Sequence, residues 1–129
     1  MISESELKKY SSTALAFVGD AVFTLAVRAR LTSCSLAKSG KLHEESNKYI
    51  NAVNQSRLLT ELEEMLTTAE QEVVRRGRNA YTNNKAKAAG LGEYADSTAY
   101  EALLGYLYLS GNENRLNELL GLALKGARV

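Results

Sequence analysis

The sequence contains no proline, so the residue that most strongly interrupts helices is missing. Apolar residues recur at spacings of three and four along most of the chain, and the period-two alternation of strands is nearly absent. We therefore expect an all-α protein. With 129 residues, the chain is long enough for a core of its own, and we expect one domain, residues 1–129.

Cysteine is also scarce. Cys34 is the only one, which excludes a disulfide within the chain and favours a reducing compartment; we expect Cys34 to be buried or half-buried. The sequence has no signal-peptide core and no apolar run near the roughly 20 residues that cross a bilayer. We expect a soluble protein without a membrane partner. Its location would be the cytoplasm, or an organellar stroma or matrix if a transit peptide once preceded Met1.

An excess of charge of one sign is absent as well. The net charge is +1, so total charge does not predict a nucleic-acid partner, and any such prediction must rest on where the charges lie. The only histidine, His43, has no neighbouring ligands at metal-binding spacing, so no zinc site is expected. We expect it on the surface or near a substrate.

Capping patterns and glycines divide the chain into helices. Thr67 with Glu70 and Thr68 with Gln71 form overlapping capping boxes, which predict a helix start. Gly40 and Gly77 are expected to break or end helices. The helices expected are a short one beginning within residues 3–6, then 13–31, 41–53, 55–66, about 67–76, about 96–110 and 113–126. Residues 78–92 have little apolar periodicity and are expected to form a surface loop with at most a short helix.

Asp20 and Glu101 each stand alone in an otherwise apolar helical stretch. Removing a carboxylate from water costs several kcal/mol unless a partner or a metal compensates. Asp20 could instead cap a helix after a break at Gly19. Glu101 could close a capping box with Thr98, unless Asp96 is the cap and leaves Glu101 free. The sequence leaves these alternatives open.

A run of basic residues forms the second feature. No acidic residue occurs between Glu72 and Glu93, and amides and Tyr81 are interleaved with the positive charges. Such a mixture suits phosphate groups, because arginine grips phosphate oxygens and amides fix the register. A solvated loop is the alternative. The candidates for binding the phosphate backbone of a nucleic acid are Arg75, Arg76, Arg78, Asn79, Lys85 and Lys87, with Asn83 and Asn84 beside them.

Three segments together resemble Mini-ribonuclease III, the small bacterial and organellar branch of the ribonuclease III endonucleases. They are residues 14–22 (ALAFVGDAV), 75–80 (RRGRNA) and 97–107 (STAYEALLGYL), and they occur in the family's order and spacing. The likeness covers nearly the whole chain, and it implies a single ribonuclease III-like catalytic domain, residues 1–129, with no separate RNA-binding domain. It implies the all-α ribonuclease III endonuclease fold, a homodimer, Mg²⁺ as cofactor and cleavage of double-stranded RNA to 5′-phosphate and 3′-hydroxyl ends. The role it implies is maturation of large-subunit (23S) ribosomal RNA precursor, with a ribosomal protein or pre-ribosome as a further candidate partner.

The resemblance also assigns residues. Asp20 matches the essential aspartate and Glu101 the metal-binding glutamate, which makes both candidate catalytic and metal-binding residues. Full-length ribonuclease III has further acids where this chain has Thr13, Ala16 and Thr98. We therefore expect one Mg²⁺ held by Asp20, Glu101, waters and substrate phosphate, since magnesium often keeps several waters. A sparse acidic set also suits two alternatives, a ribonuclease III-like domain that binds structured RNA without cutting it, and a helical protein-interaction module.

Overall fold

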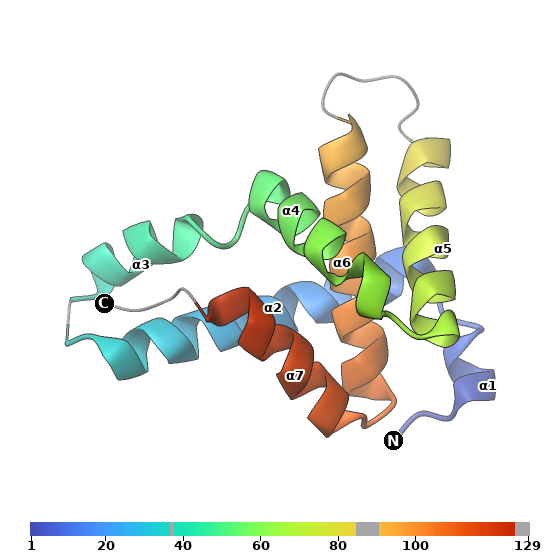
Figure 1. Cartoon of the computed structure of the whole chain (residues 1–129), viewed down its shortest axis with the longest axis horizontal. Coiled ribbons are helices and arrows are strands. Elements are labelled where there is room, and N and C mark those ends of the chain that lie inside the picture. The colour runs from blue at the N-terminus through green and yellow to red at the C-terminus, as the bar shows by residue number, and fades with distance from the viewer. Residues whose placement is uncertain (37, 85–90, 126–129) are drawn as a thin grey trace.

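The computed structural model describes residues 1–36, 38–84 and 91–125, and every regular element within these ranges is helical (Figure 1). The expectation of an all-α protein is confirmed. None of the described helices is both long enough and apolar enough to cross a membrane. In chain order the elements are α1 (Glu4–Leu7), α2 (Ser12–Cys34), α3 (Ser39–Asn47), α4 (Ala52–Leu62), the 3-10 helix η1 (Glu63–Met65), α5 (Thr68–Asn84), α6 (Leu91–Leu109) and α7 (Glu113–Leu124).

The helix starts follow the capping residues. Ser3 caps α1 and accepts a hydrogen bond from the amide of Glu6. Thr67 and Glu70 form the predicted capping box: the Thr67 amide donates to Glu70 Oε1 at 2.9 Å, and the Glu70 amide donates to Thr67 Oγ1 at 3.1 Å. Local side-chain chemistry therefore fixes where these helices begin.

The expected end of a helix at Gly77 is wrong. α5 continues through Gly77 to Asn84, and α6 begins at Leu91, so most of the surface loop expected over 78–92 is helix. Residues 85–90, which include Lys85 and Lys87, lie outside the described residues. A Cβ at position 77 would lie 2.7 Å from Ala99 Cα, so this glycine is there to let α5 and α6 approach closely.

The second helix break was also misplaced. Gly40 lies within the first turn of α3, and the chain leaves the helix after Asn47. α4 then begins behind Asn51, whose Oδ1 accepts from the Asn54 amide at 2.8 Å. The Asn51 cap therefore divides the stretch 41–53, which the sequence pattern predicts to be one helix.

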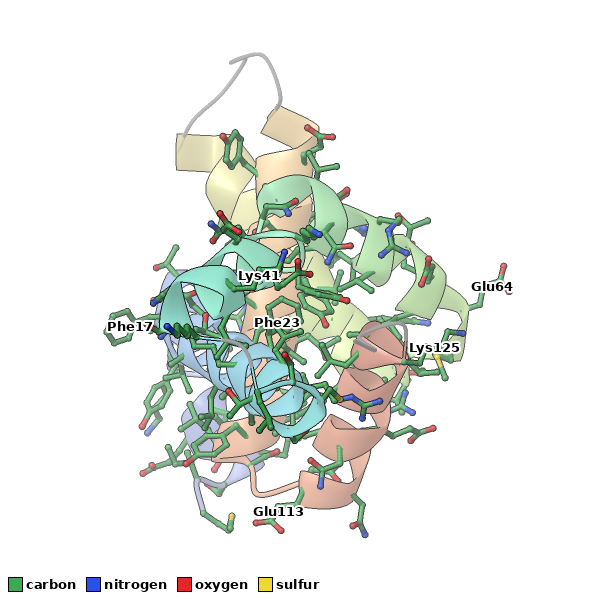
Figure 2. All side chains as sticks on the ribbon, turned by 90° about the vertical axis from the view of Figure 1, so that its left-hand side faces the viewer. Phe17, Phe23, Lys41, Glu64, Glu113 and Lys125 are labelled. Atoms are coloured by element: carbon green, nitrogen blue, oxygen red, sulfur yellow. The ribbon has the colours of Figure 1, made fainter. Side chains whose placement is uncertain are left out.

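α6 forms the centre of the fold and packs against α2, α4 and α5 (Figure 1). Phe23 and Tyr100 are fully buried and meet edge to face, with ring centroids 5.3 Å apart. Figure 2 shows Phe23 among the helices and Phe17 pointing away from them. The largest fully buried side chains are Tyr100, Phe23, Leu59, Leu103, Leu104, Leu107, Leu119 and Val27.

Cys34 is exposed, which contradicts the expectation that it would be buried or half-buried. It is the last residue of α2, beyond Leu31, the last buried residue of that helix. The end of α2 therefore extends past the core, where a small apolar residue finds no cover.

Candidate active site

The site is built where α2 crosses α6, and glycines allow the two backbones to touch. A Cβ at Gly19 would lie 1.7 Å from the carbonyl oxygen of Glu101, and a Cβ at Gly105 would lie 2.0 Å from the carbonyl oxygen of Leu15. No side chain fits at either point. Figure 1 shows the N-terminal half of α2 passing behind α6, so that the two helices cross. Asp20 and Glu101 therefore start from backbones in direct contact.

The two carboxyl groups interact. The pKa of Glu101 is raised to about 7. The largest cause is burial, and the negative charge of Asp20 and a hydrogen bond between the two carboxyl groups act in the same direction. A hydrogen bond from Gln55 works in the opposite direction. Asp20 is exposed and Glu101 is half-buried, so the pair opens to solvent on one side. The structure thus brings together two acids that lie far apart in the sequence.

Neither acid is a helix cap. α2 begins at Ser12, behind the cap residue Ser11, so Asp20 lies in the helix interior. α6 begins at Leu91, so Glu101 lies well beyond the first turn. The capping-box alternative for Glu101 is wrong, and so is the alternative that Asp96 caps this helix. Both carboxylates are left free for other partners.

A buried glutamine supports Glu101 from α4. The Nε2 of Gln55 donates to Glu101 Oε2 at 3.3 Å, and the hydroxyl of Ser97 donates to Gln55 Oε1. The sequence argument missed Gln55. A signal was present, because Gln55 shares the buried face of α4 with Leu58, Leu59 and Leu62, and a polar residue on an apolar face needs a partner.

Asp96 does not join the pair. Its Oδ2 accepts from Ser56 Oγ at 2.6 Å and its Oδ1 accepts from Arg78 Nε at 2.7 Å. Within residues 1–36, 38–84 and 91–125, no three acidic, histidine or cysteine side chains group into a metal site. The acidic set that the structure brings together is therefore Asp20 and Glu101.

Comparison with known proteins assigns the family. The model of the Ribonuclease III domain matches residues 13–112 of the chain. The chain belongs to this family. Mini-ribonuclease 3 of Brevibacillus brevis is 44% identical over 106 residues, which cover 82% of this chain and 79% of that protein. Mini-ribonuclease 3 of Symbiobacterium thermophilum is 45% identical over 106 residues, 82% of each chain. A crystal structure of a protein from Fusobacterium nucleatum has a TM-score of 0.82 and 26% identity, and covers 93% of this chain and 96% of that one.

The donor set of this ribonuclease III domain suits a hard divalent cation. Mg²⁺ takes oxygen ligands and is commonly held by one or two carboxylates together with water. Asp20 and Glu101 supply such oxygens from two helices. Burial and, after it, the negative charge of Asp20 raise the pKa of Glu101, and a bound cation would relieve the repulsion between the two carboxylates. The residues present therefore fit Mg²⁺.

The arginines of the ribonuclease III domain lie on α5, not on a loop. Arg75 pairs with Glu72 at 2.6 Å on the same helix, whereas Arg78 bridges to Asp96 at 2.7 Å and to Glu63. Arg76 donates to the Tyr10 carbonyl at 3.4 Å. The segment between Glu72 and Glu93 contains no acidic residue, but Arg75 and Arg78 pair with acidic side chains from outside the segment. Arg75, Arg78 and Asn79 line one hollow between η1 and α5.

Proposed function

We propose that this protein is a Mg²⁺-dependent endoribonuclease that hydrolyses phosphodiester bonds in double-stranded RNA, with Asp20 and Glu101 holding the ion. The observation that carries the proposal is the meeting of these carboxylates at the glycine-mediated crossing of α2 and α6. An endoribonuclease of the ribonuclease III family is what membership implies, because the matched relatives are Mini-ribonuclease 3 proteins over most of their length.

The protein's own residues prepare the site for a cation. With no ion present, the raised pKa keeps a proton on Glu101 for part of the time near neutral pH. Metal ligands must be deprotonated, so ion binding displaces that proton. Asp20 and Glu101 would hold Mg²⁺, and the chemistry that the ion would supply there is a lower pKa of a coordinated water and stabilisation of charge on the scissile phosphate. Because Asp20 is exposed, a duplex phosphate can approach from solvent.

Double-stranded RNA is the substrate that suits the basic residues. Proteins recognise an RNA duplex mainly through phosphates and 2′-hydroxyls. We assign this contact to Arg75, Arg76, Arg78, Asn79, Lys85 and Lys87. Arg75 and Arg78 are both paired with acids, but the Arg75–Glu72 pair is exposed and stays within α5, so we expect Arg75 to exchange its partner for phosphate more readily. The natural substrate we propose is the precursor of 23S ribosomal RNA, in the cytoplasm.

A homodimer is supported by an uncovered apolar face of α2. Phe17 is 81% exposed and Leu25 is 70% exposed, and Ala14 and Ala21 are exposed on the same helix (Figure 2). Large exposed apolar side chains in a row mark an interaction surface. We infer that a second copy covers them, because a two-fold pair of identical sites suits a duplex whose strands are related by an approximate dyad.

The test is cleavage of a long RNA duplex by the purified protein, with Mg²⁺ and with EDTA. Wild type should cut only with Mg²⁺. Asp20→Asn should fold, bind the duplex and leave it intact, whereas Glu44→Gln, an exposed acid on α3, should cut as wild type does. Cleavage by Asp20→Asn at the wild-type rate would falsify the role of Asp20.

A second candidate is a domain that binds structured RNA without cutting it. The small acidic set favours it, since the described residues hold no group of three acidic, histidine or cysteine ligands. It predicts duplex binding that EDTA does not change and no cleavage with Mg²⁺. The same experiment therefore separates the two functions.

A further inference from the structure

The proposed function gives no role to the buried amide of Gln55. Its side chain lies on the apolar face of α4 and the residue is only 2% exposed. An amide in such a place costs free energy unless its donor and acceptor groups are paired. A leucine would continue the face of Leu58, Leu59 and Leu62 without that cost. The amide therefore needs a reason beyond packing.

The two hydrogen bonds of Gln55 fix its orientation. The Ser97 hydroxyl donates to Oε1, so the carbonyl end of the amide points to Ser97 and the NH₂ end points to Glu101. A reversed amide would set its carbonyl oxygen against a carboxylate oxygen, which repels it. Ser97 lies one turn before Glu101 on α6. The same helix thus carries both the acid and the hydroxyl that orients its partner.

We propose that Gln55, oriented by Ser97, is a positioning residue that holds the carboxylate of Glu101 in the direction required to bind a divalent cation; this rests on the function proposed above. A free glutamate side chain samples several rotamers and loses that freedom on binding an ion. A hydrogen bond to Oε2 removes part of this freedom before an ion binds. Hydrogen bonds to ligating carboxylates are a general means of orienting them, and their loss typically weakens metal affinity 10–100-fold.

The neighbouring pair of residues provides a matched control. Ser56 follows Gln55 on α4, and its hydroxyl donates to Asp96, which precedes Ser97 on α6. Ser56→Ala therefore removes one hydrogen bond between the same two helices without touching Glu101 or Gln55. Gln55→Met keeps a side chain of similar length and loses the amide, and Ser97→Ala keeps the amide but releases its orientation.

The experiment titrates the whole purified protein with Mn²⁺, a paramagnetic probe of Mg²⁺ sites, and follows free Mn²⁺ by electron paramagnetic resonance without RNA. We expect Gln55→Met to raise the dissociation constant about tenfold, Ser97→Ala to raise it by a smaller factor, and Ser56→Ala to leave it unchanged. Thermal unfolding of each variant in EDTA measures any purely structural effect. In cleavage assays, the Mg²⁺ concentration for half-maximal rate should rise with the Mn²⁺ dissociation constant.

Asp20→Asn separates the two proposals. If Asp20→Asn loses Mn²⁺ binding but Gln55→Met and Ser97→Ala both retain wild-type affinity, the positioning role is overturned and the proposed function stands. Equal weakening by Ser56→Ala would also overturn it, because the effect would then follow the contact between α4 and α6. If Asp20→Asn binds Mn²⁺ as tightly as wild type, the proposed metal site itself is wrong and the positioning role is lost with it.

Discussion

The main chain of Gly19 lies directly against the carbonyl group of Glu101, so close that a Cβ at position 19 would be 1.7 Å from the carbonyl oxygen. This contact is between two backbones, which cannot move aside as a flexible side chain could. It fixes the crossing point of α2 and α6, and Asp20 follows Gly19 in the next position. One small residue therefore controls both the packing of the fold and the meeting of the two acids.

Gly19→Ala should therefore separate the helices. Adding a methyl group to a well-packed contact typically costs about 1–3 kcal/mol, and we expect the upper end because the clash is with backbone. Urea unfolding should show this loss of stability. The cleavage rate should also fall under conditions where the variant is still folded, because Asp20 moves relative to Glu101. Gly121→Ala is the control: nothing lies within 4 Å of its Cβ position in α7, and it should be neutral or stabilise by about 0.5–1 kcal/mol. Equal stability of the two variants would contradict the described contact.

The pH dependence of stability should report the burial of Glu101 beside Asp20. In the folded, metal-free protein the pKa of Glu101 is raised from 4.5 to about 7. The folded state therefore binds a proton that the unfolded chain releases, and this contribution is fully present below pH 4.5 and is lost as pH rises through 7. We expect the urea midpoint in EDTA to decrease across this window more for wild type than for Glu101→Gln. The Glu44→Gln variant controls for the removal of one exposed acid and should follow wild type.

The arginines of α5 should divide into two kinds. Arg78 links α5 to Asp96 on α6 and to Glu63 on η1 and is half-buried, whereas the pair of Arg75 with Glu72 is exposed and stays within one helix. Exposed pairs contribute about 0–1 kcal/mol, so Arg75→Ala should change stability little. Arg78→Ala leaves a half-buried carboxylate without its partner and should destabilise measurably more. Chemical denaturation of the two variants checks this.

If both arginines contact phosphate, binding to duplex RNA should weaken in both variants, and each should reduce the dependence of binding on salt. Filter binding over a range of salt concentrations measures that slope. An unchanged slope for Arg75→Ala, together with unchanged stability, would remove Arg75 from the RNA-binding residues.

The sequence sufficed where the cause is local. The box of Thr67 with Glu70 predicted the start of α5, because both partners lie within one helical turn. It failed where the cause is distant. The sequence pattern predicts a helix end at Gly77, but in the structure this glycine allows Ala99 of α6 to approach α5 closely. No local pattern distinguishes these two uses of glycine. The link from Arg78 to Asp96 joins two different helices and likewise leaves no periodic trace.

The candidate site shows the same division. Asp20 and Glu101 stood out because acids are rare in apolar helices, and their meeting depends on Gly19, whose contact with α6 only the fold reveals. Gln55 could have been found from the apolar face of α4, but its partners could not, because Ser97 and Glu101 come from another helix. Residue type therefore predicts which side chains need partners, and the fold supplies the partners.

The apolar face of α2 leads to the last prediction. Phe17 is 81% exposed, so little of its side chain is covered by the rest of the described protein, and Phe17→Asp should leave the monomer folded. At an interface between two copies, it would bury a charge against an apolar surface, which is strongly unfavourable. We expect analytical ultracentrifugation to give the mass of a monomer for the variant and of a dimer for wild type. We also expect the variant to lose cleavage of both strands. Tyr108→Asp, at a 58% exposed position near the end of α6, controls for a charge on an exposed aromatic site and should remain dimeric. A dimeric Phe17→Asp protein would show that the two copies meet elsewhere, because burying an unpaired charge in an interface costs about 3–5 kcal/mol.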